Sequence, residues 1–165
     1  MTEEEKKEIL QRLVTRVSTG LFFVGLDYLP RHKTPDSAWI RSIYILISFH
    51  TELLLKAIYI VNNKFQDLED LDNRLRKFGH NLEKIGDEIT KEGSSSFGIK
   101  SIRLKGHEYS VETDGGGFLV QNFNDIRYDF IDGRIRTLNG IEHELFKQQI
   151  EIMISITNKL KPFAW

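Results

Sequence analysis

The sequence predicts a mainly α-helical protein: an up-and-down bundle of four to five helices with a small β insertion. Apolar residues recur at spacings of three and four over 68–89 and over 141–160, which is the period of amphipathic helices. The segment Ala38–Val61 is apolar on most sides, as a buried core helix is. Between the helical segments, 98–122 alternates apolar and polar residues around glycine-rich turns, which predicts an inserted hairpin or three-stranded meander.

The composition is that of an ordinary globular chain. We expect one domain, 1–165, from the 165 residues. The net charge of −1 argues against a general attraction to nucleic acid or to anionic membranes. The absence of cysteine excludes disulfides and thiolate zinc sites and fits a cytoplasmic location. His50, Glu52 and Lys56 lie at the centre of the apolar segment, so it is predicted to be a core helix and not a membrane span.

Helix ends can be predicted from capping residues. The capping box Thr2–Glu5 begins a first helix, which is expected to reach about Tyr28 with a bend near Gly20. Thr34 is the predicted N-cap of the apolar helix, which is expected to end near Asn63.

Two further helices follow from periodicity. A seven-residue repeat predicts one continuous helix from Leu68 to Gly93, packed antiparallel against a neighbour. A final helix is expected to begin near Asn139, an N-cap residue, and to stop at Pro162.

The apolar helix carries polar residues on two faces. At 100° per residue, Ser48, Glu52 and Lys56 share one stripe, while His50 falls on the opposite, most apolar face. His50 is therefore predicted to be a structural core histidine, with catalysis or ligand binding as the alternative. No second histidine or carboxylate has metal-ligand spacing, so the sequence predicts no metal and no cofactor.

Three short motifs, in this order, resemble the HEPN domain family (higher eukaryote and prokaryote nucleotide-binding) of the bacterial or phage type. They are Glu52–Ala57, Gly79–Leu82 and Asp125–Tyr128. The resemblance covers roughly residues 35–160. It implies a helical bundle whose long second and third helices pack antiparallel, and the β insertion is a departure from that pattern.

The resemblance implies several kinds of function. Some members are metal-independent ribonucleases of toxin or phage-defence type, some are partners of nucleotidyltransferases, and others only bind. The ribonucleases carry an arginine, a polar residue and, after four to six intervening residues, a histidine, and a homodimer brings two such motifs together. Arg136 with His143, and as runner-up Arg74 with His80, have a compatible spacing. An ordinary surface arginine and a structural histidine remain the alternative for each pair.

His143 in the first turn of the last helix would act as the base, because helix amides and the dipole favour a phosphate and a neutral imidazole there. Arg136 would stabilise the transition state. Thr137 follows Arg136, which departs from the family motif.

A ligand site is the other possibility that the resemblance raises. Arg127 and Tyr128 match a family feature that is often structural, with Arg127 pairing to Asp125 or to Glu52. Alternatively Arg127 and Lys56 hold a nucleotide phosphate. The leading expectation is a non-catalytic module that binds RNA or nucleotide. An endoribonuclease, or a structural partner of a nucleotidyltransferase or antitoxin, are the rivals, so whether the chain is an enzyme stays open.

Overall fold

The computed structural model describes residues 1–28, 37–91, 97–122 and 140–165, and within them the side chains outside 26–28, 37–41 and 140–143. This part of the chain forms five α-helices, one π-helical segment and one three-stranded antiparallel sheet. The predicted fold class, a helical bundle with a small β-meander, is confirmed.

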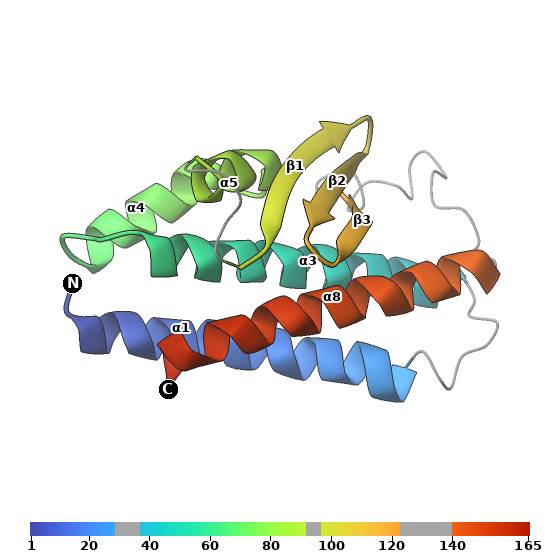
Figure 1. The fold of residues 1–165 in the computed structure, drawn as a ribbon, viewed down its shortest axis with the longest axis horizontal. Coiled ribbons are helices and arrows are strands. Elements are labelled where there is room, and N and C mark those ends of the chain that lie inside the picture. The colour runs from blue at the N-terminus through green and yellow to red at the C-terminus, as the bar shows by residue number, and fades with distance from the viewer. Residues whose placement is uncertain (29–36, 92–96, 123–139) are drawn as a thin grey trace.

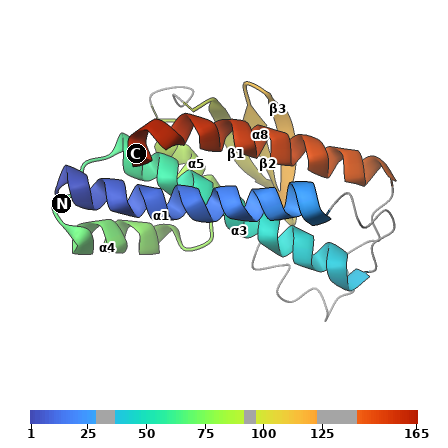
Figure 2. The ribbon, with the colours of Figure 1, turned by 90° about the horizontal axis from the view of Figure 1, so that it is seen from below.

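The helices and the sheet form layers around one central helix (Figure 1). Helix α3, Ser37–Asn62, runs through the middle of the molecule. Helices α1, Glu3–Phe22, and α8, Gly140–Ala164, pack together on one side of α3. On the other side lie α4, Leu68–Phe78, and α5, Leu82–Ile89, followed by the sheet. Figure 2, seen from below, shows α1 lying across α3 beside α8.

Helix α3 is a core helix, as its apolar sequence predicts. Its most enclosed side chains are Leu54, Leu55, Ala57, Ile58 and Ile60, and each large one contributes about 2 kcal/mol through burial. The stretch Ser42–Asn62 has the length and hydropathy of a membrane-crossing helix, but 72% of its apolar window is buried against the rest of the chain. Contact with the other layers therefore accounts for its apolar character.

His50 is buried against Gly20 of α1. Its Nδ1 is 2.6 Å from the carbonyl oxygen of Leu46, one turn earlier, so Nδ1 carries the proton and donates. Burial lowers the pKa of His50 and outweighs the opposite effect of the Leu46 carbonyl. His50 is 6% exposed, in the core where the sequence places it, and its imidazole fills the space that a side chain at position 20 would need.

The first helix has no break at Gly20, where the sequence predicts a bend. Helix α1 is regular to Phe22 and then widens into a π-helical segment, η1, Phe23–Tyr28. Gly20 serves the close approach of α1 to His50, which is a packing role that the sequence alone does not distinguish from a bend. The capping box at Thr2 is present as predicted, with Glu5 N donating to Thr2 Oγ1 at 3.2 Å.

The prediction of one continuous third helix is wrong. The chain breaks between α4 and α5, at Gly79 and the two residues that follow it. Gly79 has a φ of +56°, in the left-handed region that glycine adopts most readily. Asn81 then caps α5, since its side-chain oxygen accepts a hydrogen bond from Lys84 N at 3.0 Å. Both helices still run antiparallel to α3 (Figure 1).

The inserted meander consists of β1, Ile99–Lys105, β2, Glu108–Thr113, and β3, Gly116–Gln121. Cross-strand pairs such as Ile102 with Val111 and Val111 with Phe118 place the apolar side chains on one face. That face packs against α3 and α5, so the sheet completes the core.

The end of the chain differs from the prediction in one detail. Pro162 lies inside α8, which continues to Ala164. A proline in the last turn removes only one amide donor, and Trp165 N still bonds to the carbonyl of Lys161 at 3.2 Å.

The contact between Gly20 and His50 predicts a strong non-additivity. Gly20→Ala should lower the free energy of unfolding by about 3 kcal/mol, because the new methyl group overlaps the imidazole. In a His50→Ala background the same change should stabilise by up to about 1 kcal/mol, the helix preference for alanine. Urea unfolding of the four proteins measures the coupling. Thr19→Ala, an exposed neighbour, is the control, and additive effects would contradict this packing.

Candidate functional site

The polar stripe of α3 faces the layer formed by the α4–α5 turn and the sheet. Ser48 and Glu52 are both buried, and Ser48 Oγ donates to the carbonyl of Gln121 in β3 at 3.0 Å. Lys56 follows one turn after Glu52 and remains partly exposed. Side chains four residues apart lie on one helix face, so these three form a line along α3 that the later part of the chain covers.

The turn between α4 and α5 brings a histidine to this line. His80 sits between Gly79, the residue at which α4 ends, and Asn81, which caps α5. Its Nδ1 lies 2.8 Å from Glu52 Oε2. Because an ionised carboxylate only accepts hydrogen bonds, Nδ1 carries the proton in this contact.

Glu52 is thus a buried carboxylate with two nitrogen partners. Lys56 Nζ lies 2.6 Å from Oε1, while His80 Nδ1 contacts the other oxygen. The Glu52 side chain is only 6% exposed, against 18% for Lys56 and 43% for His80. Removing a carboxylate from water is costly unless it is paired, so the lysine and the histidine hold it in place. We call these three residues the Glu52 cluster.

The Glu52 cluster has two chemical capabilities. It presents the Lys56 ammonium, which has N–H groups beyond the one given to Glu52, at a partly exposed position beside an imidazole whose Nδ1–H is given to Glu52. An ammonium group of this kind suits an anion such as a phosphate. It also orients an imidazole by a carboxylate, as catalytic dyads do. Covalent catalysis would in addition require a nucleophile within hydrogen-bonding reach of the imidazole.

The predicted ligand-binding residues are only partly described. Lys56 belongs to the Glu52 cluster. Asp125, Arg127 and Tyr128 lie outside the described residues, so the predicted pairing of Arg127 with Glu52 stays a prediction. The described partners of Glu52 are Lys56 and His80.

The runner-up pair, Arg74 and His80, is held by separate partners. Arg74 Nε donates to Asp70 at 2.8 Å, and its guanidinium lies 5.3 Å from the centre of the Phe65 ring. His80 contacts Glu52 on α3. The sequence argument placed both residues on one continuous helix, which the break at Gly79 contradicts.

Arg136 lies outside the described residues, as does the side chain of His143. The backbone of α8 begins at Gly140, so position 143 lies in its first turn, as the sequence predicts.

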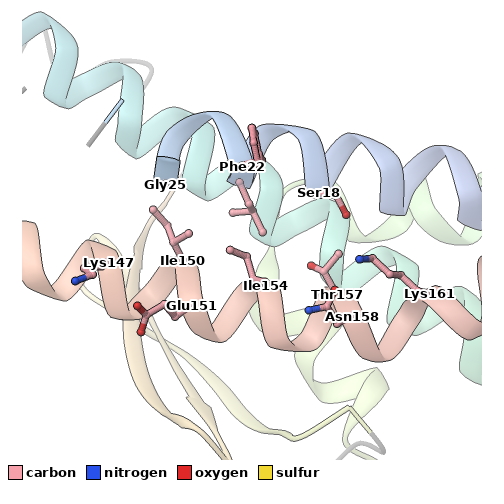
Figure 3. Close-up of a pocket in the computed structure, with 11 residues that line it drawn as sticks. Ser18, Phe22, Gly25, Lys147, Ile150, Glu151, Ile154, Thr157, Asn158 and Lys161 are labelled. Atoms are coloured by element: carbon pink, nitrogen blue, oxygen red, sulfur yellow. The ribbon is translucent and has the colours of Figure 1, made fainter. Parts of the chain in front are cut away.

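A second candidate binding site is an apolar groove between the end of α1 and α8, with a volume of about 350 Å³. Figure 3 shows Phe22 on α1 facing Ile150 and Ile154 on α8, with Thr157 and Lys161 farther along the same helix. Apolar walls of this kind suit an apolar side chain or a lipid-like group.

Sequence reasoning missed the pairing of Glu52 with His80. The available indication was the tripeptide Gly79-His80-Asn81, because a glycine followed by an asparagine is also the pattern of a helix end and a new N-cap. The seven-residue repeat outweighed that pattern in the prediction.

The described side chains include no group of three or more histidine, aspartate or glutamate residues placed to hold a metal ion. Comparisons with family models, curated proteins and solved structures found no match for this chain. The HEPN resemblance therefore stays a prediction, and the geometry of the site carries the functional argument.

Two ion pairs with equal N–O distances should differ in how much they stabilise the fold, because one is buried and the other is exposed. Glu52–Lys56 and Asp72–Arg76 both have a spacing of four and an N–O distance of 2.6 Å. Glu52→Ala should destabilise the fold by about 2 kcal/mol, because the hydrogen bonds from Lys56 and His80 to a buried, charged carboxylate are lost. Asp72→Ala, in the exposed pair, should cost less than about 1 kcal/mol. Equal losses in thermal or urea unfolding would contradict the role assigned to Glu52.

Proposed function

We propose that the chain is an HEPN-like binding module for RNA or a nucleotide, acting without catalysis. The observation that carries this proposal is the Glu52 cluster, in which one buried carboxylate holds Lys56 and His80 at the same partly exposed position. The resemblance adds Arg127 and Tyr128 to the same ligand. The Lys56 ammonium, held in place by Glu52, and an arginine are a suitable pair of donors for one phosphate group.

The net charge of the chain implies that phosphate binding would depend on the charged groups at the site itself. The chain as a whole has a net charge of −1, so it exerts no general attraction on a polyanion. An ammonium group has three N–H donors, and the Lys56 ammonium donates to Glu52 Oε1. The phosphate would share the lysine with Glu52, which favours a modest affinity and a defined position.

The test is binding of single-stranded RNA and of ATP, measured by calorimetry at low and at physiological salt. Lys56→Gln should weaken binding about tenfold, the value of one charge-assisted hydrogen bond. Lys84→Gln removes the same charge from an exposed position on α5 and should leave the affinity nearly unchanged. Failure of both ligands to bind, or equal losses in the two variants, would reject the proposal.

The second candidate function, that of a metal-independent endoribonuclease, is favoured by one observation. Helix α8 begins at Gly140, which puts position 143 where helix amides can contact a phosphate. In this alternative His143 takes the proton from an RNA 2′-hydroxyl and Arg136 stabilises the phosphorane.

RNA cleavage in EDTA distinguishes the two functions. If the ribonuclease candidate holds, wild-type protein cleaves RNA in EDTA and His143→Ala loses at least about a hundredfold in rate, the usual contribution of a general base. If the binding module holds, RNA is bound and recovered intact, and His143→Ala has no effect on its recovery.

A further inference from the structure

The groove between α1 and α8 has one apolar end and one polar end (Figure 3). At the apolar end Phe22 of α1 faces Ile150 and Ile154 of α8. The polar end is lined by Ser18 of α1 and Lys161 of α8. Its volume of about 350 Å³ is within the range of sites for small ligands. We call this site the α1–α8 groove.

The apolar walls of the α1–α8 groove remain open to solvent in the described part of the chain. Phe22 is 62% exposed and Ile154 is 39% exposed. Both side chains would lose contact with water if an apolar group lay between them, and burial of apolar surface is a main source of affinity for small ligands. The groove therefore favours a ligand with an apolar part.

The apolar end of the groove is closed by a close approach of the two chain segments. Gly25 of η1 lies so near α8 that a Cβ atom there would be 3.2 Å from Ile150 Cγ2. The distance from Gly25 back to Ser18 is about 10 Å at the rise of an α-helix. An extended alkyl chain advances by about 1.2 Å per bond, so the tail of octanoate matches this length.

The polar end carries donors that the protein itself does not use. Within the described part of the chain, the side chains of Ser18, Asn158 and Lys161 make no hydrogen bond or ion pair. Figure 3 shows Lys161 extending along the groove towards Thr157 and Ser18. A carboxylate at this end would accept hydrogen bonds from the ammonium and hydroxyl groups.

The charges along α8 determine which way an anionic ligand would lie. The charged residues that line the groove are Lys147, Glu151 and Lys161. Lys147 and Glu151 are four residues apart, so their opposite charges lie on one helix face and offset each other. A carboxylate near them would also meet the charge of Glu151. The Lys161 end is therefore the favourable end for an anion, and the tail would point towards Gly25.

We propose that the α1–α8 groove binds a free medium-chain fatty acid. The carboxylate contacts Lys161 and Ser18, while the alkyl tail lies between Phe22 and Ile154 and ends at Gly25. This ligand matches the groove in length, in the position of its apolar part and in the sign of its charge. The site goes beyond the proposed function, because it shares no residue with the Glu52 cluster.

The test is NMR titration of the isotope-labelled whole chain with octanoate below its micelle concentration. Octanoate should bind about tenfold more tightly than hexanoate, because each further buried methylene contributes up to about fourfold. Decanoate should gain no more than about twofold over octanoate, since its tail exceeds the groove. Octylammonium has the same tail and the opposite charge, and it should bind about tenfold more weakly than octanoate.

Variants at the two ends of the groove separate the roles of head and tail. Lys161→Gln should weaken octanoate about fivefold, the value of an exposed ion pair, and leave octanol unchanged. Lys147→Gln removes the same charge from the other end of the groove and should alter octanoate affinity less than about twofold. Ile154→Asn should weaken octanoate and octanol alike, about tenfold, with Ser155→Asn, an exposed neighbour outside the groove, as its control.

Three results would overturn the proposal: no chemical-shift change at Phe22, Ile154 and Lys161 with octanoate, equal losses in the two lysine variants, or binding to phosphatidylcholine vesicles without binding of monomeric octanoate. A dimer that Ile154→Asn dissociates, seen by sedimentation without octanoate binding, would assign the groove to a second copy of the chain and also overturn it. None of these measurements involves Lys56 or RNA. The groove and the proposed function can therefore fail independently.

Discussion

The structure depends on the enclosure of α3 between two layers. Because this helix is covered by α1 and α8 on one side and by α4, α5 and the sheet on the other, its polar side chains must find partners inside the protein. Each buried one does: Ser48 bonds to β3, Thr51 to the carbonyl of Ile47, and His50 to that of Leu46. Glu52 is the most demanding, since it carries a charge, and its partners determine where the α4–α5 turn lies.

Much of the fold could be predicted because it follows from local chemistry. The capping box at Thr2, the core position of His50 and the three strands all depend on residues near one another in sequence or on simple periodicity. The continuous third helix could not be excluded in this way. The apolar residues of α4 and of α5 are those that face α3. Their spacing, four residues from Phe78 to Leu82, therefore continues unchanged across the break at Gly79.

The candidate sites were predicted less completely, and the reason is sequence distance. Glu52 and Lys56 are one turn apart, and their association is visible in the sequence. His80, in contrast, lies 28 positions after Glu52 in the sequence. It contacts Glu52 from the turn between α4 and α5, and the seven-residue repeat continues across that turn without a change.

Native-state hydrogen exchange tests most directly the claim that Glu52 fixes the α4–α5 layer to the central helix. In the wild type, the amides of α3 from Leu54 to Ile60 should exchange only through global unfolding, because they lie in the most enclosed part of the core. In Glu52→Gln, the amides of α4 and α5 should lose protection while those of α1 and α8 keep theirs relative to global stability. A uniform loss across all helices, or none in α4 and α5, would contradict the account.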